Sequence, residues 1–140
     1  MQNNFVFLPV AVQILLTVVL YARLAITRAK ASQHGLVNEE RRALYDDAWP
    51  DHVVQVSNCL RNQFEAPVLF YVLVISLWLV NGVNLYVHIF AWAFVLSRIV
   101  HASVHLGSNA VPLRRTVFIL GGLNIVALTV FLVYSITAGA

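Results

Sequence analysis

The chain has 140 residues, of which 60% are hydrophobic and only 11% are charged, and its mean hydropathy is +0.78. Soluble domains contain about 45–50% apolar and about 25% charged residues, so this composition excludes a soluble domain, a disordered chain and a disulfide scaffold. The net charge of +3 comes from few ions, and we expect no nucleic-acid partner. The composition is that of an integral membrane protein.

Four stretches are apolar and long enough to cross a bilayer, because a hydrocarbon core of about 30 Å needs about 20 helical residues. They cover about residues 5–27, 58–80, 83–106 and 116–138. No stretch alternates apolar and polar residues as a membrane barrel would. The sequence therefore predicts one all-α domain over residues 1–140, an up-down bundle of four transmembrane helices.

Local signals refine the predicted boundaries. Pro50 suits the start of a helix that begins before the membrane, because a missing N–H costs nothing there. Pro67 can kink the second span, which neighbouring helices tolerate. Asn81 and Gly82 predict a tight turn between antiparallel helices, and Pro112 marks the start of the fourth helix.

The basic side chains indicate the orientation. They gather in the connection of about residues 28–57 and in the short connection before the fourth span: Arg28, Lys30, Arg41, Arg42, Arg114 and Arg115. The positive-inside rule places both connections in the cytoplasm and both termini on the non-cytoplasmic side. A bacterial inner membrane and an endoplasmic reticulum membrane fit equally well.

Polar residues with helical spacing occur inside the second and third spans. In the second span they repeat at i, i+3, i+4 and i+7, which predicts one shared helical face: Asn58, Arg61, Asn62 and Glu65. The third span repeats this spacing with Arg98, His101 and His105. At about 1.5 Å per residue, Glu65 and Arg98 both lie about 21–22 Å from the outer turn. We expect a structural Glu65–Arg98 ion pair, hydrogen-bonded to Asn62.

Three functions compete for this cluster. A paired glutamate and arginine could have a purely structural role and hold two helices together. Alternatively, a proton-coupled transporter could use Glu65. The surplus of polar and positive groups instead favours a site for an anionic ligand that enters from the cytoplasm. His101 and His105 have the spacing of zinc ligands, with Glu65 as a third candidate, but the nearby arginines would repel a cation, so we expect no metal site.

Two motifs resemble those of a known family. Residues 61–67 (RNQFEAP), followed by an apolar run, are similar to the second-helix signature of the MAPEG superfamily, the membrane-associated proteins in eicosanoid and glutathione metabolism. Residues 98–107 (RIVHASVHLG) and 112–114 (PLR) resemble its third helix and the entry to its fourth. The resemblance covers the whole chain and is greatest to the microsomal glutathione transferase and microsomal prostaglandin E synthase branch.

The resemblance implies a homotrimer that binds glutathione between subunits on the cytoplasmic side. The positions that match glutathione-binding residues are Arg61, Asn62, Glu65, His101 and His105, with Arg28 reaching the ligand from a neighbouring subunit. Arg114 matches the arginine that stabilises the glutathione thiolate, and is the candidate catalytic residue. Arg98 resembles an arginine of the polar bundle core.

The implied activity is that of a glutathione S-transferase or peroxidase acting on lipophilic electrophiles or lipid hydroperoxides dissolved in membrane lipid. The alternative is a protein of the same fold that binds a lipid or glutathione without chemistry, as the lipoxygenase-activating member does. His105 and Phe118 stand where relatives have tyrosines, and Arg115 replaces a small hydroxyl residue. These differences argue against prostaglandin synthesis and leave thiol activation open.

Overall fold

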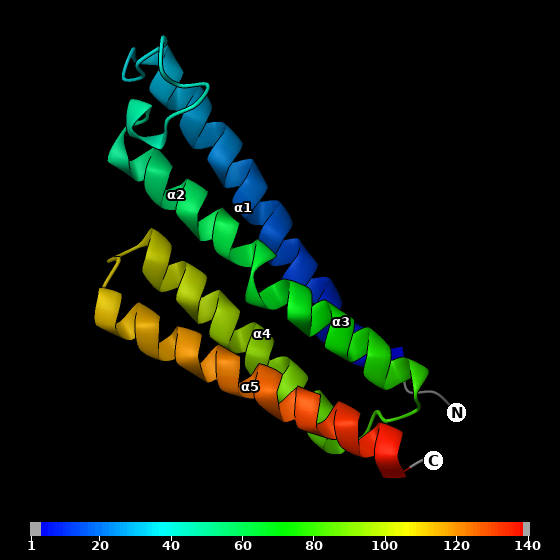
Figure 1. Cartoon of the computed structure of the whole chain (residues 1–140). Helices are drawn as coiled ribbons and strands as arrows, with labels where there is room; N and C mark the ends of the chain where they lie inside the picture. Colours follow the sequence, from blue (N-terminus) through cyan, green and yellow to red (C-terminus); the bar gives the residue numbers. More distant parts are fainter. Residues whose placement is uncertain (1–3, 139–140) are drawn as a thin grey trace.

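The computed structural model describes residues 4–138, which form a bundle of four long helical segments that alternate in direction (Figure 1). In chain order the elements are the 3-10 turn η1 (Asn4–Val6), α1 (Phe7–Gln33), the 3-10 turn η2 (Asp46–Ala48), α2 (Asp51–Arg61), the 3-10 turn η3 (Asn62–Phe64), α3 (Ala66–Leu79), α4 (Leu85–Leu106) and α5 (Val111–Ala138). The described ends of the chain lie at the same end of the bundle (Figure 1).

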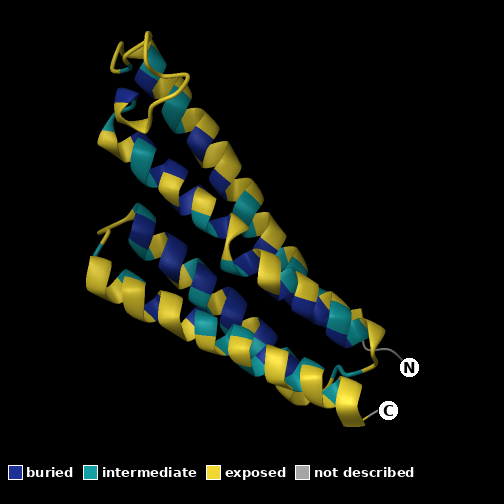
Figure 2. Ribbon diagram, viewed as in Figure 1, coloured by how far each residue is buried: buried dark blue, intermediate teal, exposed yellow. Residues whose placement is uncertain are grey.

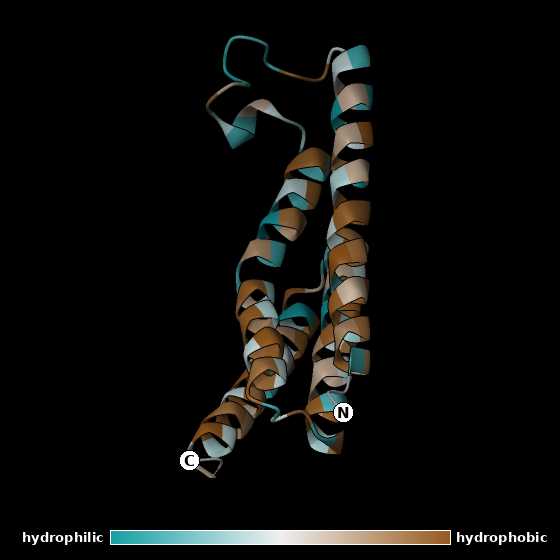
Figure 3. Cartoon of the chain, turned by 90° about the vertical axis from the view of Figure 1, so that its right-hand side faces the viewer, coloured by the Kyte–Doolittle hydropathy of each residue, from teal (hydrophilic) through white to brown (hydrophobic). Residues whose placement is uncertain are grey.

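Four helical segments are long and apolar enough to span a membrane: Asn4–Gln33, Asp51–Leu79, Leu85–Leu106 and Val111–Ala138. Only 22–39% of each apolar stretch is buried within the chain. The outward faces are exposed and largely hydrophobic (Figures 2 and 3). Such faces need lipid or other protein around them, so the predicted four-helix fold is confirmed and the chain is a multi-pass integral membrane protein.

Two helices extend further than the predicted spans. α1 continues to Gln33, so Arg28 and Lys30 are helical residues and not part of the connection. The helix ends where Gly35 adopts a φ of +64°, a conformation that glycine enters without steric cost. α5 begins at Val111, earlier than residue 116, because Pro112 suits a first helical turn.

The turn at residues 80–84 is the tight one that the sequence predicts. Asn81 has a φ of +55°, and its N–H donates to the Trp78 carbonyl while the Gly82 N–H donates to the Leu77 carbonyl. This is the Schellman pattern that ends α3. Asn84 then caps α4, since its side-chain oxygen accepts the Val87 N–H at 3.1 Å.

The second span is interrupted at η3. Pro67 has no N–H for the carbonyl four residues earlier, and its ring clashes with that carbonyl, so the α-helical pattern cannot continue through this point. The backbone bends at Glu65 (φ −101°, ψ −105°) before α3 begins at Ala66. The break separates the residues before it from those after it on the predicted polar face.

Two apolar clusters hold the bundle. The terminal cluster lies toward the end that carries the described chain ends and contains Val6, Phe70, Leu73, Val74, Leu77, Val87, Ala91, Phe94, Val95 and Leu128. The second cluster joins α1, α2 and α4 toward the opposite end and is built of Leu20, Leu24, Ala31, Val53, Val56, Cys59, Leu60 and Ala102. Toward this end the ribbons of α1 and α2 spread away from those of α4 and α5, which stay side by side (Figure 1).

Candidate functional site

A polar pocket of about 350 Å³ opens where η3, the second half of α4 and the first turns of α5 meet. Its lining residues are Asn62, Glu65, His101, Val111, Arg114, Arg115 and Phe118. Its volume falls within the range of about 300–1,000 Å³ that small-ligand sites occupy. The fold therefore brings together four of the predicted site residues, namely Asn62, Glu65, His101 and Arg114.

His101 links the three elements that form the polar pocket. It is 2% exposed, and its Nδ1 lies 3.2 Å from the Arg114 carbonyl oxygen, which can only accept a hydrogen bond. Nδ1 therefore carries the proton in this contact, which leaves Nε2 of the neutral ring as an acceptor, 3.5 Å from the Asn62 amide nitrogen. His101 thereby fixes the positions of Asn62 and Arg114 relative to each other.

Arg98 lies beneath the polar pocket and is 1% exposed. Its Nη2 donates to the Asn62 backbone carbonyl at 3.0 Å, and its guanidinium carbon lies 5.8 Å from the centre of the Phe118 ring. In a continuous helix the Asn62 carbonyl would accept the Ala66 N–H, but the break at η3 removes this donor. Arg98 supplies the missing hydrogen bond.

The predicted Glu65–Arg98 ion pair is not formed as a direct contact, although the two charges lie close enough to interact electrostatically. Glu65 occupies the backbone bend before α3, and its side chain is exposed at the polar pocket, while Arg98 is buried against Asn62. The prediction assumed an unbroken helix through residues 58–80, in which Glu65 would have remained on the face of Asn58. The break at η3 interrupts the helical register between Asn62 and Glu65, although both still line the polar pocket.

Two charged groups of the polar pocket have no partner within residues 4–138. The Glu65 carboxylate and the Arg115 guanidinium make neither a hydrogen bond nor an ion pair there. Arg114, in contrast, is oriented by the turn before α5, because its Nη1 donates to the Asn109 side-chain oxygen at 2.7 Å. The pocket thus offers one oriented cation, one free cation and one free anion.

Arg61 and Arg28 lie outside the polar pocket of the single chain. Arg61 pairs with Asp46 of η2 at 2.8 Å, so the predicted shared face of Arg61, Asn62 and Glu65 is not formed. Arg28 stacks on Trp49, with its guanidinium carbon 5.0 Å from the ring centre. Its predicted contact was with a ligand on another subunit, which remains a prediction.

His105 lies one turn from His101 on α4 and packs against it edge to face, with ring centres 5.8 Å apart. It is 4% exposed and does not line the polar pocket. The Gln55 amide donates to the His105 carbonyl and so ties α2 to the end of α4. Within the described part of the chain, no three His, Cys, Asp or Glu side chains are placed to hold a metal ion.

Two partners of the site arginines were not predicted from the sequence. Asn109, with a φ of +50°, orients Arg114, and Asp46 pairs with Arg61. Asparagine tolerates the left-handed conformation and could have been expected at this turn. Asp46 is separated from Arg61 by 15 positions and lies in an irregular connection, so no periodic signal joins them.

The charge balance of the polar pocket favours an anion. Arg114 and Arg115 line the pocket with two positive charges against the single negative charge of Glu65, and the buried Arg98 adds a third behind Asn62 and Phe118. The first turn of the 28-residue helix α5 also lines the pocket, and a helix N-terminus carries a partial positive charge with unsatisfied N–H groups. A ligand with carboxylates and one ammonium group would match this arrangement.

Comparisons with known proteins give one match. No curated protein and no solved structure matches the chain significantly. The model of the MAPEG family, by contrast, matches residues 6–134, which includes all of α1 to α4, most of α5 and every residue that lines the polar pocket. The chain therefore belongs to the MAPEG family, which includes glutathione-dependent membrane enzymes.

Proposed function

We propose that the protein is a glutathione-dependent membrane enzyme, a transferase or peroxidase, that binds glutathione at the polar pocket. The observation that carries this proposal is the combination of an oriented Arg114 with an unpaired Arg115 and an unpaired Glu65 at one pocket. Within the family, the motifs favour the microsomal glutathione transferase branch, because Phe118 replaces a tyrosine of prostaglandin E synthase and Arg115 replaces its small hydroxyl residue.

The charges of glutathione complement those of the polar pocket. Its two carboxylates suit arginines, since the planar guanidinium donates two parallel hydrogen bonds to a carboxylate. Its ammonium group suits the Glu65 carboxylate, which has no partner within the described residues. Asn62 and His101 then provide neutral hydrogen-bonding groups between the charged ones. We infer that bound glutathione replaces the solvent or lipid contacts of these side chains.

Arg114 is the proposed catalytic residue. Its guanidinium is oriented by Asn109 and lies in the first turn of α5, so two sources of positive charge would stabilise a glutathione thiolate. The thiolate sulfur would attack an electrophilic carbon, forming a C–S bond while the leaving group departs with its electron pair. With a hydroperoxide, the sulfur would attack the terminal oxygen, and the O–O bond would break to give glutathione sulfenic acid and an alkoxide that is protonated to the alcohol. The thiol of a second glutathione would then attack the sulfenic sulfur, forming glutathione disulfide and releasing water.

A second candidate function is binding without chemistry. No Ser, Thr or Tyr hydroxyl lines the polar pocket, and Phe118 and Arg115 occupy the positions where the family resemblance expects hydroxyl groups. A protein that holds glutathione or a lipid would need the charges of the pocket but no thiolate. The lipophilic co-substrate of the enzyme, or the lipid of the binding protein, would reach the pocket from the bilayer.

The oligomer is also a proposal. We propose a homotrimer in which Arg28, and Arg61 once released from Asp46, reach glutathione on a neighbouring subunit. Only 22% of the apolar stretch of α1, and 22% of that of α5, is buried within the chain, so the exposed apolar faces of both helices are available for subunit contacts. The positively charged end of the bundle would face the cytoplasm, in a bacterial inner membrane or an endoplasmic reticulum membrane.

Ultraviolet difference absorbance of glutathione with the detergent-purified protein tests this function. We expect a thiolate signal at neutral pH that falls about tenfold in Arg114→Ala, because an adjacent positive charge favours the ionised thiol. Arg41→Ala is the matched control: it removes the same charge from an arginine that pairs with Asp47 in the connection, outside the polar pocket. This control should keep the full signal.

Two other results would change the conclusion. Glutathione binding without a thiolate signal would support the non-catalytic alternative and contradict the enzyme. Absence of binding, with both variants still folded, would contradict both functions and leave the polar cluster as a structural clamp. A thiolate signal would justify assays with lipophilic electrophiles and lipid hydroperoxides, which separate transferase from peroxidase activity.

A further inference from the structure

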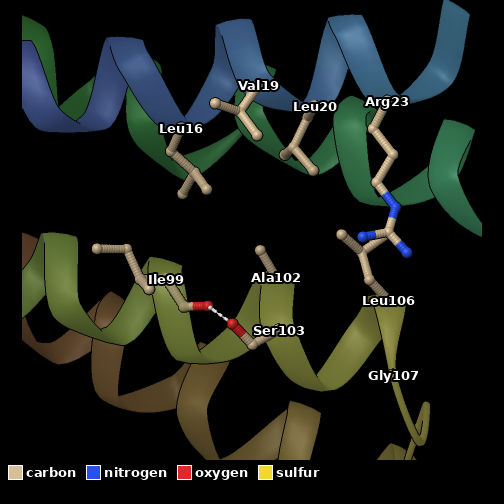
Figure 4. A pocket seen from close by; sticks show the side chains of 9 residues that line it. All are labelled: Leu16, Val19, Leu20, Arg23, Ile99, Ala102, Ser103, Leu106 and Gly107. Carbon is tan, nitrogen blue, oxygen red and sulfur yellow. Dashed lines mark hydrogen bonds between the residues drawn. The ribbon is translucent and has the colours of Figure 1, made fainter. Parts of the chain in front are cut away.

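A second pocket, of about 370 Å³, lies between α1 and α4 (Figure 4). We name it the Arg23 pocket, after the only charged residue that lines it. It shares no lining residue with the polar pocket. His101 lines the polar pocket while its neighbour Ala102 lines the Arg23 pocket, so the two sites lie on different faces of α4. A ligand in one does not occupy the other.

Apolar side chains of α1 and α4 form the two walls. Leu16 and Leu20 on α1 stand opposite Ile99 and Ala102 on α4 (Figure 4). Positions 16, 20 and 23 on one helix, and 99, 102 and 106 on the other, follow helical spacing and give two facing stripes. From residue 16 to residue 23 the stripe is about 10 Å long, at about 1.5 Å per residue.

Small side chains leave the space between the stripes. Ala102, which is 3% exposed, and the adjacent Ser103 both have small side chains. Larger side chains at these two positions of α4 would fill the gap toward α1. The Ser103 hydroxyl donates to the Ile99 carbonyl of its own helix at 2.8 Å, so it is not directed at a ligand. The walls of the Arg23 pocket thus offer apolar contacts and no oriented polar group.

Arg23 is the exception. Its guanidinium extends from α1 toward Leu106 and Gly107, where α4 ends (Figure 4). Within residues 4–138 this guanidinium makes no hydrogen bond, ion pair or stacking contact. An ionised side chain on a membrane-spanning helix is costly without a partner, so Arg23 requires an anionic group from outside the chain or water at the membrane surface.

We propose that the Arg23 pocket binds a long-chain fatty acid, with its carboxylate on Arg23 and its hydrocarbon chain between α1 and α4. A carboxylate fits the single guanidinium, since the planar fork donates two hydrogen bonds to it and no second cation lines the pocket to match a phosphate. A volume of about 370 Å³ lies near the lower end of ligand sites and suits one chain.

The position of Arg23 agrees with the amphiphilic shape of this ligand. The guanidinium lies level with the end of α4, while Leu16 and Ile99 lie deeper in the spans. A carboxylate at Arg23 would remain near the membrane surface, and the chain would descend into the apolar part of the bundle. This ligand is not the electrophile of the proposed reaction, because the polar pocket lies on the other face of α4.

Photolabelling of the protein in phosphatidylcholine nanodiscs tests the proposal. The probe is a fatty acid with a diazirine in its chain, and oleate is the competitor. We expect cross-links on α1 and α4 that oleate displaces and methyl oleate does not. Arg23→Gln should raise the Kd of oleate about tenfold, which is about 1.4 kcal/mol. Lys30→Gln, which removes the same charge from α1 outside the pocket, should leave the Kd unchanged.

A second variant keeps the test valid if Arg23→Gln folds poorly. Ser103 is exposed at the pocket, so Ser103→Phe should fill the space and abolish labelling while Arg23 stays in place. Equal competition by methyl oleate, or equal losses in Arg23→Gln and Lys30→Gln, would overturn the proposal. Displacement by lysophosphatidate but not by oleate would assign the pocket to a phosphate headgroup instead.

One further result would also overturn it. If Ser103→Phe changes the oligomeric state and leaves labelling intact, a second copy of the chain covers the Arg23 pocket. The thiolate measurement on the same samples separates this proposal from the proposed function, since the two pockets share no residue. Fatty acid binding without thiolate formation would retain the inference and contradict only the enzyme.

Discussion

The two ends of the bundle share α4 but differ in the other helices that build their cores and in what fills them. Near the described chain ends, Phe70 and Phe94 stack with ring centres 4.6 Å apart, and both are fully buried. Toward the other end, α4 instead buries Arg98, His101 and His105, and both pockets open there. One end therefore holds the helices together, and the other presents polar groups and space for ligands.

The break at η3 marks the change between these regions. An unbroken second span would have satisfied the Asn62 carbonyl within its own helix and left Arg98 without this acceptor. After the break, α3 contributes apolar residues to the terminal cluster, and its Pro67 is buried. The terminal cluster therefore provides stability, while the helices around η3 provide the site, and substitutions can test this division.

The largest expected effect is on the terminal cluster. Phe94→Ala removes a fully buried ring that stacks on Phe70, and a buried phenylalanine truncated to alanine costs about 3–5 kcal/mol. Unfolding by sodium dodecyl sulfate in mixed micelles, followed by circular dichroism, would measure the loss. Phe64→Ala is the control, because Phe64 is 54% exposed and should cost far less. Equal losses would contradict the role of the terminal cluster.

A smaller effect is expected where α4 meets α5. A Cβ at Gly121 would lie 2.9 Å from the Ser97 hydroxyl oxygen and 3.9 Å from the Phe94 ring. Gly121→Ala would displace the hydroxyl from its hydrogen bond to the Phe94 carbonyl, which is worth about 1 kcal/mol. The same unfolding titration should therefore show Gly121→Ala to be less stable than Gly122→Ala by about 1 kcal/mol.

Gly122 is a matched control because it is the adjacent glycine of the same helix, and a Cβ there meets nothing within 4 Å. Both substitutions change helix propensity in the same way, so their difference reports the packing of α4 on α5. If Gly122→Ala were the less stable variant, the close approach of the two helices at Ser97 would be wrong.

Features set by local chemistry could be predicted from the sequence. The four spans follow from apolar length, and the turn at Asn81 follows from a residue that tolerates the left-handed conformation. Pro67 was expected to kink its helix, which the break at η3 confirms. Asn62, Glu65, His101 and Arg114 were expected near one another, and they line one pocket.

Features that depend on the path of the backbone could not be predicted. Helical spacing predicts that Arg61 lies beside Glu65. The 3-10 segment η3 instead interrupts the helix between them, and Arg61 pairs with Asp46. The partner of Arg98 is a main-chain carbonyl freed by the break, and no side-chain pattern indicates it. Asn109 reaches Arg114 across a turn, where spacing rules for helices do not apply.

The smallest effect on stability is expected for Glu65→Gln, and its size distinguishes the predicted Glu65–Arg98 ion pair from the arrangement in the structure. Breaking a buried ion pair by removing one partner costs about 3–5 kcal/mol, because the other charge stays buried and unpaired. Glu65 is exposed and makes no hydrogen bond or ion-pair contact within residues 4–138, so its interaction with Arg98 is screened and Glu65→Gln should change the free energy of unfolding by less than about 0.5 kcal/mol. Glutathione affinity should nevertheless fall, because the neutral amide no longer attracts the ammonium group.

Glu40→Gln, in the connection between α1 and α2, is the control and should alter neither the free energy of unfolding nor the glutathione affinity. A loss of stability near that of Phe94→Ala would instead show that Glu65 does balance Arg98, and that the second end of the bundle also contributes to holding the helices together.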